Sequence, residues 1–358
     1  MTIAASMRKR QGELSALTLP ASVEGAPGTT GATEVPGTHP ADGAVGIGRA
    51  HAKAIVLGEH AVVYGAPAIA LPVPQLTVTA RAGWSSHSGD DGGDLSFTMS
   101  GSASRAVVTQ ASHSLRRLVG AFKERMGVRG GPPLQVGLDG AIPPGRGLGS
   151  SAANSRAVVM ALAGLFGREL TEDMAFDLVQ TAENMTHGRA SGVDAMTVGA
   201  SAPLLFQAGR ARRPAIGCDD VFIVADSGTA GSTKEAVELL RAGFGQRAGA
   251  REAFVQRATR LVDQAGRALA EGRPAELGAR LTDYHELLHG AGLSTDRIDT
   301  LVRAALAAGS HGAKITGGGL GGCVLALASP QAAGRVTQQL LEAGAVRTWA
   351  VPLRGRQP

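Results

Sequence analysis

The 358-residue sequence has little of several features that mark whole classes of protein. Its two cysteines, Cys218 and Cys323, lie far apart, so they form neither a zinc-ligand spacing nor a disulfide framework, and a reducing cytoplasm is the expected location. No apolar run approaches the roughly 18 residues that a membrane span needs. The first 20 residues lack the apolar core of a secretory signal. We therefore expect a cytoplasmic protein without a membrane partner.

Aromatic residues and lysines are also scarce. Aromatics make up 3% of the chain. The net charge is +5, and almost all of the 35 basic residues are arginines. Because no arginine cluster alternates with aromatic side chains that could stack on bases, no nucleic-acid partner is expected. Five lysines are present, and Lys53, Lys234 and Lys314 each lie in a short segment that contains glycine, serine or threonine. A compact point charge would serve at such positions.

The length predicts two domains. Residues 1–44 are rich in Gly, Pro, Thr and Ala and lack periodicity, so they are predicted to be a disordered tail. Strands mixed with helices indicate an α+β or an α/β fold. The arginine-rich, proline-containing stretch 209–219 is typical of a connector, which places the domains at 45–215 and 216–358. Strands are predicted at 54–57, 68–73, 77–81, 95–99, 134–138, 221–225, 313–315 and 323–327, and helices at 104–126, 151–166, 171–185, 232–241, 252–271, 274–288, 296–308 and 330–342.

A glycine-rich segment, PPGRGLGSSAA at 143–153, runs directly into an apolar helical stretch. Its alternating glycines allow the backbone to approach a ligand. Ser150 and Ser151 fall where the helix begins, and the free N–H groups at a helix N-terminus favour anions. The segment predicts a phosphate-binding loop, although it lacks the Lys-Ser/Thr ending of the common P-loop. A tight turn with an ordinary serine cap is the alternative interpretation.

A second glycine-rich segment, KITGGGLGGC at 314–323, has five glycines in six consecutive positions. Each glycine costs backbone entropy on folding, so we expect the run to serve close approach of the backbone to another group. A bulged hairpin between two strands is the alternative. Taken together, the two glycine-rich segments predict a polyphosphate that is held from two sides.

Polar residues flank an apolar strand in the segment HAKAIVLGEHAVVY, residues 51–64. Lys53 precedes the apolar run, and Glu59 and His60 follow it, positions from which side chains often reach a cleft. The alternative is a solvated lysine and a structural histidine.

Two carboxylates follow further along the chain. Glu183 ends a predicted helix and Asp194 follows a Ser-Gly turn, so one site could contain both. Proteins hold Mg²⁺ with one or two carboxylates plus phosphate oxygens, and phosphoryl transfer depends on positioning and charge neutralisation. A helix-surface carboxylate is the alternative for Glu183.

These four segments, in this order, resemble the GHMP kinase superfamily of galactokinases, homoserine kinases, mevalonate kinases and phosphomevalonate kinases. The resemblance covers about residues 46–353. The two glycine-rich segments are specific to the superfamily. KAIVLGEHAVVYG, HGRASGVDAMTVG and GSTKEAV are most similar to the mevalonate kinase branch. Galactokinases have Asn-Leu-Ile in place of Ala-Ile-Val here, and phosphomevalonate kinases usually have Tyr in place of His60.

The resemblance implies a two-domain α+β fold with nucleotide and substrate in the cleft between the domains. It implies ATP-dependent phosphorylation of the C5 hydroxyl of mevalonate, with Mg²⁺, in the route to isoprenoids. Dimers are common in the superfamily, so a homodimer is a possible assembly, although nothing in the sequence identifies an interface. Asp194 is the implied general base, and Lys53 its partner that stabilises developing charge. Ser151 and Glu183 are the implied Mg²⁺ ligands. Substrate contacts are implied for Glu59, His60 and Thr233, and nucleotide contacts for Pro144, Gly145, Gly147, Leu148, Gly149, Ser150, Ser151, Gly318 and Gly319.

Two positions depart from the pattern. Asn154 stands where animal mevalonate kinases usually have an aromatic residue, and Thr186 where an aliphatic residue is common. No cation for the substrate carboxylate is evident. Arg189 is one candidate, and a surface arginine without this role is the favoured interpretation of it. Another superfamily kinase or a catalytically inactive relative are the alternatives, although Lys53, Glu183 and Asp194 are all intact. A dinucleotide-binding oxidoreductase is disfavoured because no GxGxxG follows the first strand.

Overall fold

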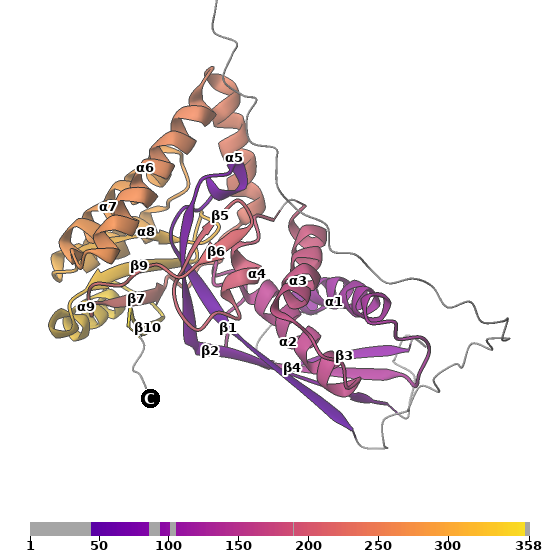
Figure 1. The fold of residues 1–358 in the computed structure, drawn as a ribbon. Coiled ribbons are helices and arrows are strands. Elements are labelled where there is room, and N and C mark those ends of the chain that lie inside the picture. The colour runs from indigo at the N-terminus through magenta and orange to yellow at the C-terminus, as the bar shows by residue number, and fades with distance from the viewer. Residues whose placement is uncertain (1–43, 86–93, 101–104, 189, 355–358) are drawn as a thin grey trace, which may run out of the picture. The chain divides into compact units, whose positions relative to one another are not determined.

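The computed structural model describes residues 44–85, 94–100, 105–188 and 190–354. The predicted tail at 1–44 lies outside this part except for Ala44. The described residues from Ala44 onward belong to one compact unit that contains two sheets. The α+β fold class that the sequence predicts is confirmed (Figure 1).

The first sheet has the strand order β3-β4-β2-β5-β6, and β1 pairs with β2. Among the strand pairs of this sheet in the described residues, only β3–β4 is parallel. β2 is the longest strand and pairs with β1 over most of its length, with a register shift after His51. The strands are β1 (Val45–Leu57), β2 (Ala68–Trp84), β3 (Leu95–Met99), β4 (Leu134–Gly140), β5 (Leu204–Gln207) and β6 (Arg210–Arg212).

Helix α2 lies directly against β1, and two glycines explain how it can. A Cβ atom at Gly46 would stand 1.9 Å from the carbonyl oxygen of Ala161, and one at Gly48 would stand 2.0 Å from that of Ala157. Only glycine permits this approach of helix to strand. The helical segments of the first half are η1 (Val62–Tyr64, a 3₁₀ turn), α1 (Arg105–Arg125), α2 (Ser150–Leu165), α3 (Glu172–His187) and α4 (Val193–Thr197).

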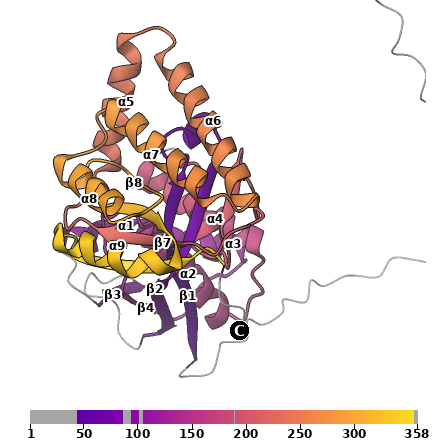
Figure 2. The same cartoon turned by 90° about the vertical axis from the view of Figure 1, so that its left-hand side faces the viewer.

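The second sheet is antiparallel with the order β10-β7-β9-β8. β9 is buried along its whole length, as expected for a strand with a neighbour on each side. Figure 2 shows α6 and α7 side by side, and α7 also contacts β8. The strands are β7 (Val221–Asp226), β8 (Gly312–Thr316), β9 (Cys323–Ala328) and β10 (Arg347–Pro352), and the helices are α5 (Thr233–Gln246), α6 (Ala250–Ala270), α7 (Pro274–Gly290), α8 (Asp296–Ala307) and α9 (Pro330–Glu342).

One hydroxyl joins the two sheets. The backbone N–H of Ile55 in β1 donates to Thr316 Oγ1 of β8 at 3.0 Å, and that hydroxyl donates to the carbonyl of Ile55 at 2.9 Å. The Thr316 side chain is buried, so water does not compete for either bond. The C-terminal end of β1 is thereby tied to the strand that leads into the second glycine-rich segment.

The strands differ from prediction in three places. β1 begins at Val45 rather than near residue 54, β2 is one strand where two were expected, and β5, β6 and β10 were not predicted. The expected domain boundary falls between β6 and β7, and the division into two domains at this point stays a prediction. Among the described residues, no helix is both long enough and apolar enough to cross a membrane.

Candidate functional site

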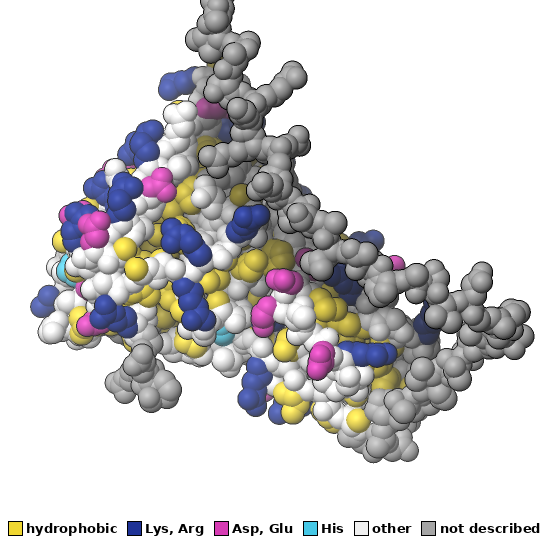
Figure 3. All heavy atoms as spheres, viewed as in Figure 1, with side chains coloured by type: hydrophobic (Ala, Val, Ile, Leu, Met, Phe, Trp, Pro, Cys, Tyr) yellow, Lys and Arg dark blue, Asp and Glu magenta, His cyan; other side chains and the backbone are white. Residues whose placement is uncertain are grey.

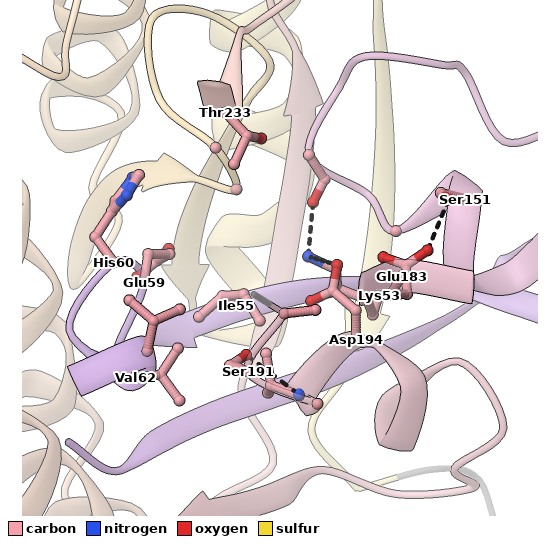
Figure 4. A pocket seen from close by; sticks show the side chains of 18 of the residues that line it. Lys53, Ile55, Glu59, His60, Val62, Ser151, Glu183, Ser191, Asp194 and Thr233 are labelled. Carbon is pink, nitrogen blue, oxygen red and sulfur yellow. Dashed lines mark hydrogen bonds and ion pairs between the residues drawn. The ribbon is translucent and has the colours of Figure 1, made fainter. Parts of the chain in front are cut away.

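A cavity of about 410 Å³ opens where β1, the start of α2, α4, α5 and the second glycine-rich segment converge (Figure 4). Its volume lies in the range of small-molecule sites. Three of the predicted site residues, Pro144, Leu148 and Gly319, do not line it, and the Leu148 side chain is buried instead. The predicted residues that line it are Lys53, Glu59, His60, Gly145, Gly147, Gly149, Ser150, Ser151, Glu183, Asp194, Thr233 and Gly318.

Lys53 and Asp194 form an ion pair in this cavity. Lys53 Nζ lies 3.0 Å from Asp194 Oδ2 and donates to the carbonyl of Gly147 at 3.1 Å. The lysine side chain is almost fully buried, whereas about a third of the aspartate side chain is exposed. The carboxylate is therefore held by a buried cation on one side and accessible to a ligand on the other.

The first glycine-rich segment leads into α2 as the sequence predicts. Gly149 caps the helix, so Ser150 and Ser151 occupy its first turn, where backbone N–H groups lack partners within the helix. The Ser151 hydroxyl donates to Glu183 Oε1 of α3 at 2.6 Å. This arrangement offers N–H donors to an anion and, beside them, two oxygen ligands to a cation.

The two glycine-rich segments touch backbone to backbone. A Cβ atom at Gly147 would stand 2.7 Å from the Cα of Gly317, and Gly317 itself has a φ of +97°. Neither glycine can be replaced by a larger residue unless the two segments move apart. The close approach that the glycine runs predict is thus made, at least in part, between the two segments themselves.

Arg146 fastens the first glycine-rich segment to the second sheet. Its Nε lies 2.8 Å from Oδ1 of Asp226, a buried residue at the end of β7. Its Nη2 donates to the carbonyl of Gly228 at 2.9 Å, and the carbonyl of Gly145 accepts from the N–H of Gly231 at 2.9 Å. Arg146 lies inside the predicted phosphate-binding loop, but nothing in the sequence pairs it with Asp226, so this contact was not predicted.

Glu59 and Lys314 form a second ion pair, which is fully buried. Burial raises the pKa of the Glu59 carboxyl and lowers that of the Lys314 ammonium, while their mutual attraction opposes both shifts. The Tyr284 hydroxyl donates to the backbone carbonyl of Glu59 at 2.9 Å. Glu59 lines the cavity, but this pairing favours a supporting role for its carboxylate. Lys234, the third lysine that the sequence singled out, does not line the cavity.

His60 lines the cavity in an unusual conformation. Its φ is +61°, and its buried Nε2 has no hydrogen-bond partner among the described residues. Burial, with a smaller contribution from Lys314, lowers its pKa to about 4, so the ring is neutral at pH 7. Thr233 begins α5 and packs tightly on the backbone of Gly318. Figure 4 shows Ile55 between the Glu59–His60 turn and the Lys53–Asp194 pair.

Several lining residues escaped the sequence reasoning. Ile55, Val62 and Val193 give the cavity an apolar stretch, and Val237 and Arg241 extend it along α5. Apolar positions of this kind look like core in a sequence. The spacing of four from Thr233 to Val237 to Arg241 is the one signal that could have grouped the α5 residues. Arg189 lies outside the described residues.

Comparison with known proteins gives consistent results over both halves of the chain. The family model described as the GHMP kinases N terminal domain matches residues 113–201, and the one described as GHMP kinases C terminal matches residues 267–346. The mevalonate kinase of Pyrococcus horikoshii is 31% identical over 299 residues, which cover 78% of this chain and 87% of the relative. The mevalonate kinase of Thermococcus onnurineus is 30% identical over 315 residues, covering 82% and 92%.

A solved structure has the same fold. L. major mevalonate kinase in complex with R-mevalonate matches with a TM-score of 0.75 at 23% identity, covering 87% of this chain and 97% of the other.

Proposed function

Because the chain belongs to the GHMP kinase family, and its curated relatives named mevalonate kinase are about 30% identical over most of its length, we propose that it phosphorylates mevalonate with ATP. The γ-phosphoryl group is transferred to the C5 hydroxyl, giving ADP and 5-phosphomevalonate on the route to isoprenoids. The observation that carries this proposal is the Lys53–Asp194 pair, which shares one cavity with both glycine-rich segments.

Asp194 is the proposed acceptor for the proton of the substrate hydroxyl. Its partly exposed carboxylate accepts a hydrogen bond from the C5 hydroxyl and turns the oxygen lone pair toward the γ-phosphorus. Lys53 holds that carboxylate in place and puts a positive charge next to the atoms that react. In a loose transition state this alignment contributes much of the rate, and the proton passes to Asp194 as the new P–O bond forms.

The triphosphate is proposed to lie along the first glycine-rich segment. The N–H groups at the start of α2 face the cavity beside Ser150 and Ser151, and they neutralise phosphate charge without the cost of reorganising water. Gly318 of the second glycine-rich segment lines the same cavity. The contact between Gly147 and Gly317 holds the two segments against each other.

Ser151 and Glu183 fit a magnesium site. A hydroxyl and a carboxylate 2.6 Å apart at a phosphate loop are the oxygen donors that Mg²⁺ takes in partly solvated sites, with phosphate oxygens as further ligands. Among the described residues, no three His, Cys, Asp or Glu side chains converge as a complete metal cage. When bound, Mg²⁺ would neutralise charge on the phosphates during transfer.

Replacing Glu183 by Gln tests this magnesium assignment. We expect the Mg²⁺ concentration for half-maximal rate to rise by at least about tenfold. Even the loss of a group that only hydrogen-bonds to a metal ligand costs about 10- to 100-fold in metal affinity, and Glu183 is a proposed ligand itself. A magnesium titration at saturating ATP and mevalonate measures it. Glu169→Gln, an exposed carboxylate outside the cavity, is the control and should leave the titration unchanged. An unaltered magnesium requirement in Glu183→Gln would reject the assignment.

The Arg146–Asp226 contact predicts a specific effect on the nucleotide. Arg146→Met releases the loop from the second sheet, and because a displacement of about 1 Å can cost about 100-fold, we expect kcat/KM for ATP to fall by about 10- to 100-fold. The KM for mevalonate should change less than twofold. Arg146→Lys should recover part of the loss, since it keeps the charge but not the second contact. Equal effects on both substrates would contradict a role confined to the loop.

Location and assembly are proposals of their own. We infer a cytoplasmic enzyme because its two cysteines, Cys218 and Cys323, are free and buried and form no disulfide framework. A homodimer is a second proposal, because dimers are common in the superfamily. Sedimentation velocity would test it.

The proposed reaction is tested by ADP release with Mg-ATP and four acceptors offered in parallel: mevalonate, 5-phosphomevalonate, galactose and homoserine. Turnover with mevalonate alone is the expected result. Turnover with another acceptor would keep the kinase chemistry and reject the substrate. Nucleotide binding without turnover on any of the four would favour a binding protein built on the same fold.

A further inference from the structure

Helix α5 presents one face to the cavity. Thr233, Val237 and Arg241 line it at intervals of four residues, so they share a side of the helix. The stripe covers about 12 Å of helix axis. Side chains on a helix lean toward its N-terminus, so the Arg241 side chain leans back toward Val237 and the interior of the cavity.

The position of α5 is fixed near Arg241. Tyr64 of η1 and Phe244 of α5 form an edge-to-face pair with ring centroids 5.9 Å apart, and Phe244 also packs against Phe254 of α6. Arg241 therefore projects from a helix that is anchored to the same turn that carries Val62 and Tyr64, two other lining residues.

Charge is distributed unevenly among the described residues that line the cavity. Their cations are Lys53 and Arg241, since His60 is neutral at pH 7. Lys53 is occupied by Asp194 and the carbonyl of Gly147. The remaining carboxylates have partners as well, Glu59 with Lys314 and Glu183 with Ser151. Arg241 has no ion pair within the described part of the chain, so its charge is available to a ligand.

Part of the cavity lining is apolar. Ile55, Val62, Val193 and Val237 contribute hydrocarbon surface to it, and Figure 4 shows Ile55 next to the Lys53–Asp194 pair. Mevalonate has a matching sequence of groups: a hydroxyl at C5, a methyl-bearing carbon at C3, and a carboxylate at C1. Its extended length is about 6 Å, so a molecule with its hydroxyl at Asp194 carries its carboxylate away from Lys53.

We propose that Arg241 binds the carboxylate of mevalonate and so selects acid substrates, an inference that rests on the proposed function. The guanidinium offers paired N–H donors that match a carboxylate. The guanidinium also sets the orientation of the bound substrate, because the carboxylate end then lies at α5 and the C5 hydroxyl lies at Asp194. Uncharged alcohols of similar size lack this contact and bind more weakly.

The test combines a side-chain change with a substrate change. Charge-assisted hydrogen bonds of this kind correspond to a factor of about 10 to 100 in affinity, so Arg241→Met should raise the KM for mevalonate by that factor while the KM for ATP stays constant. The uncharged analogue 3-methylpentane-1,3,5-triol, measured as a competitive inhibitor against mevalonate, should have the same inhibition constant in wild type and variant. Arg241→Lys should fall between the two in its KM for mevalonate.

Arg247→Met is the matched control, because Arg247 is an exposed arginine just past the end of α5 that does not line the cavity. It should leave every constant unchanged. A KM for mevalonate within twofold of wild type in Arg241→Met would overturn the Arg241 assignment and leave the proposed function intact. Equal weakening of the triol and mevalonate would also overturn it. Failure of the wild-type protein to phosphorylate mevalonate would instead reject the proposed function, and the Arg241 assignment with it.

Discussion

An Asp194→Asn variant is expected to lose at least about 100-fold in kcat while it keeps its fold. The amide cannot take up the hydroxyl proton, and proton transfer to a positioned side chain typically contributes about 10²- to 10⁴-fold. Lys53→Met should lose a similar factor, because Asp194 then lacks the cation 3.0 Å away that holds its carboxylate toward the substrate. Steady-state ADP release at saturating ATP and mevalonate measures both variants.

Asp173→Asn, an exposed carboxylate in the first turn of α3, is the matched control and should retain wild-type kcat. Circular dichroism and thermal unfolding of all three variants separate lost chemistry from lost structure. A folded Asp194→Asn or Lys53→Met protein with a kcat within tenfold of wild type would remove that residue from the mechanism. The double variant should be little worse than either single one, since the two side chains act as a unit.

Lys314→Met is expected to lower the free energy of unfolding by about 3–5 kcal/mol, the usual result of removing one member of a buried ion pair. The change leaves the Glu59 carboxylate buried without its cation. Adding Glu59→Gln should restore part of the loss, because the uncompensated charge is then gone. Urea unfolding followed by circular dichroism gives the free energies for the two variants and the wild type.

The lysine at position 234 provides the comparison. Lys234→Met changes the same residue type at an exposed position on α5, and surface changes of this kind usually stay within about 0.5 kcal/mol. If Lys314→Met were no more damaging than Lys234→Met, the pair would have no role in holding Glu59. A double variant less stable than Lys314→Met would show that Glu59 is stabilised by other groups around it.

The helices were predictable where their ends carry chemical signals. The prediction of a helix at 296–308 agrees closely with α8 at Asp296–Ala307, because Thr295 caps it and its hydroxyl accepts from the N–H of Ile298. The helix predicted at 330–342 coincides with α9, whose cap is Ser329 and whose first residue is proline. Caps act locally, so a sequence contains all that is needed to place them.

The strands were less predictable because their causes are not local. The first half of β1 contains Gly46 and Gly48, residues that disfavour strands by propensity. They are present because α2, about 110 residues later, approaches too closely for any side chain. β6 has three residues, two of them exposed arginines, and no alternation of so short a length identifies a strand. β10 pairs only with β7 at the edge of its sheet, and such edges tolerate mixed composition.

The candidate site divides in the same way. Residues inside the motifs, such as Lys53, Ser151 and Asp194, could be named from the sequence, and the structure brings them into one cavity. Their chemical roles stay predictions until the variants are measured. The partner of Lys314 could not be named, because Glu59 lies 255 residues away. Arg241 carries no motif, and its relevance appears only when the helix is placed beside the cavity.

The Thr316 hydroxyl that joins β1 to β8 has a consequence for recombination between relatives. Lys53 lies two residues before Ile55, and Gly317 directly follows Thr316, so the two bonds to Ile55 set the spacing between the lysine and the second glycine-rich segment. A chimaera joined near residue 215 inherits Ile55 from one parent and Thr316 from the other. Each half can contain every motif residue, and the chimaera can still place Lys53 at the wrong distance from the second glycine-rich segment. Exchange of the two halves succeeds where both parents share this threonine.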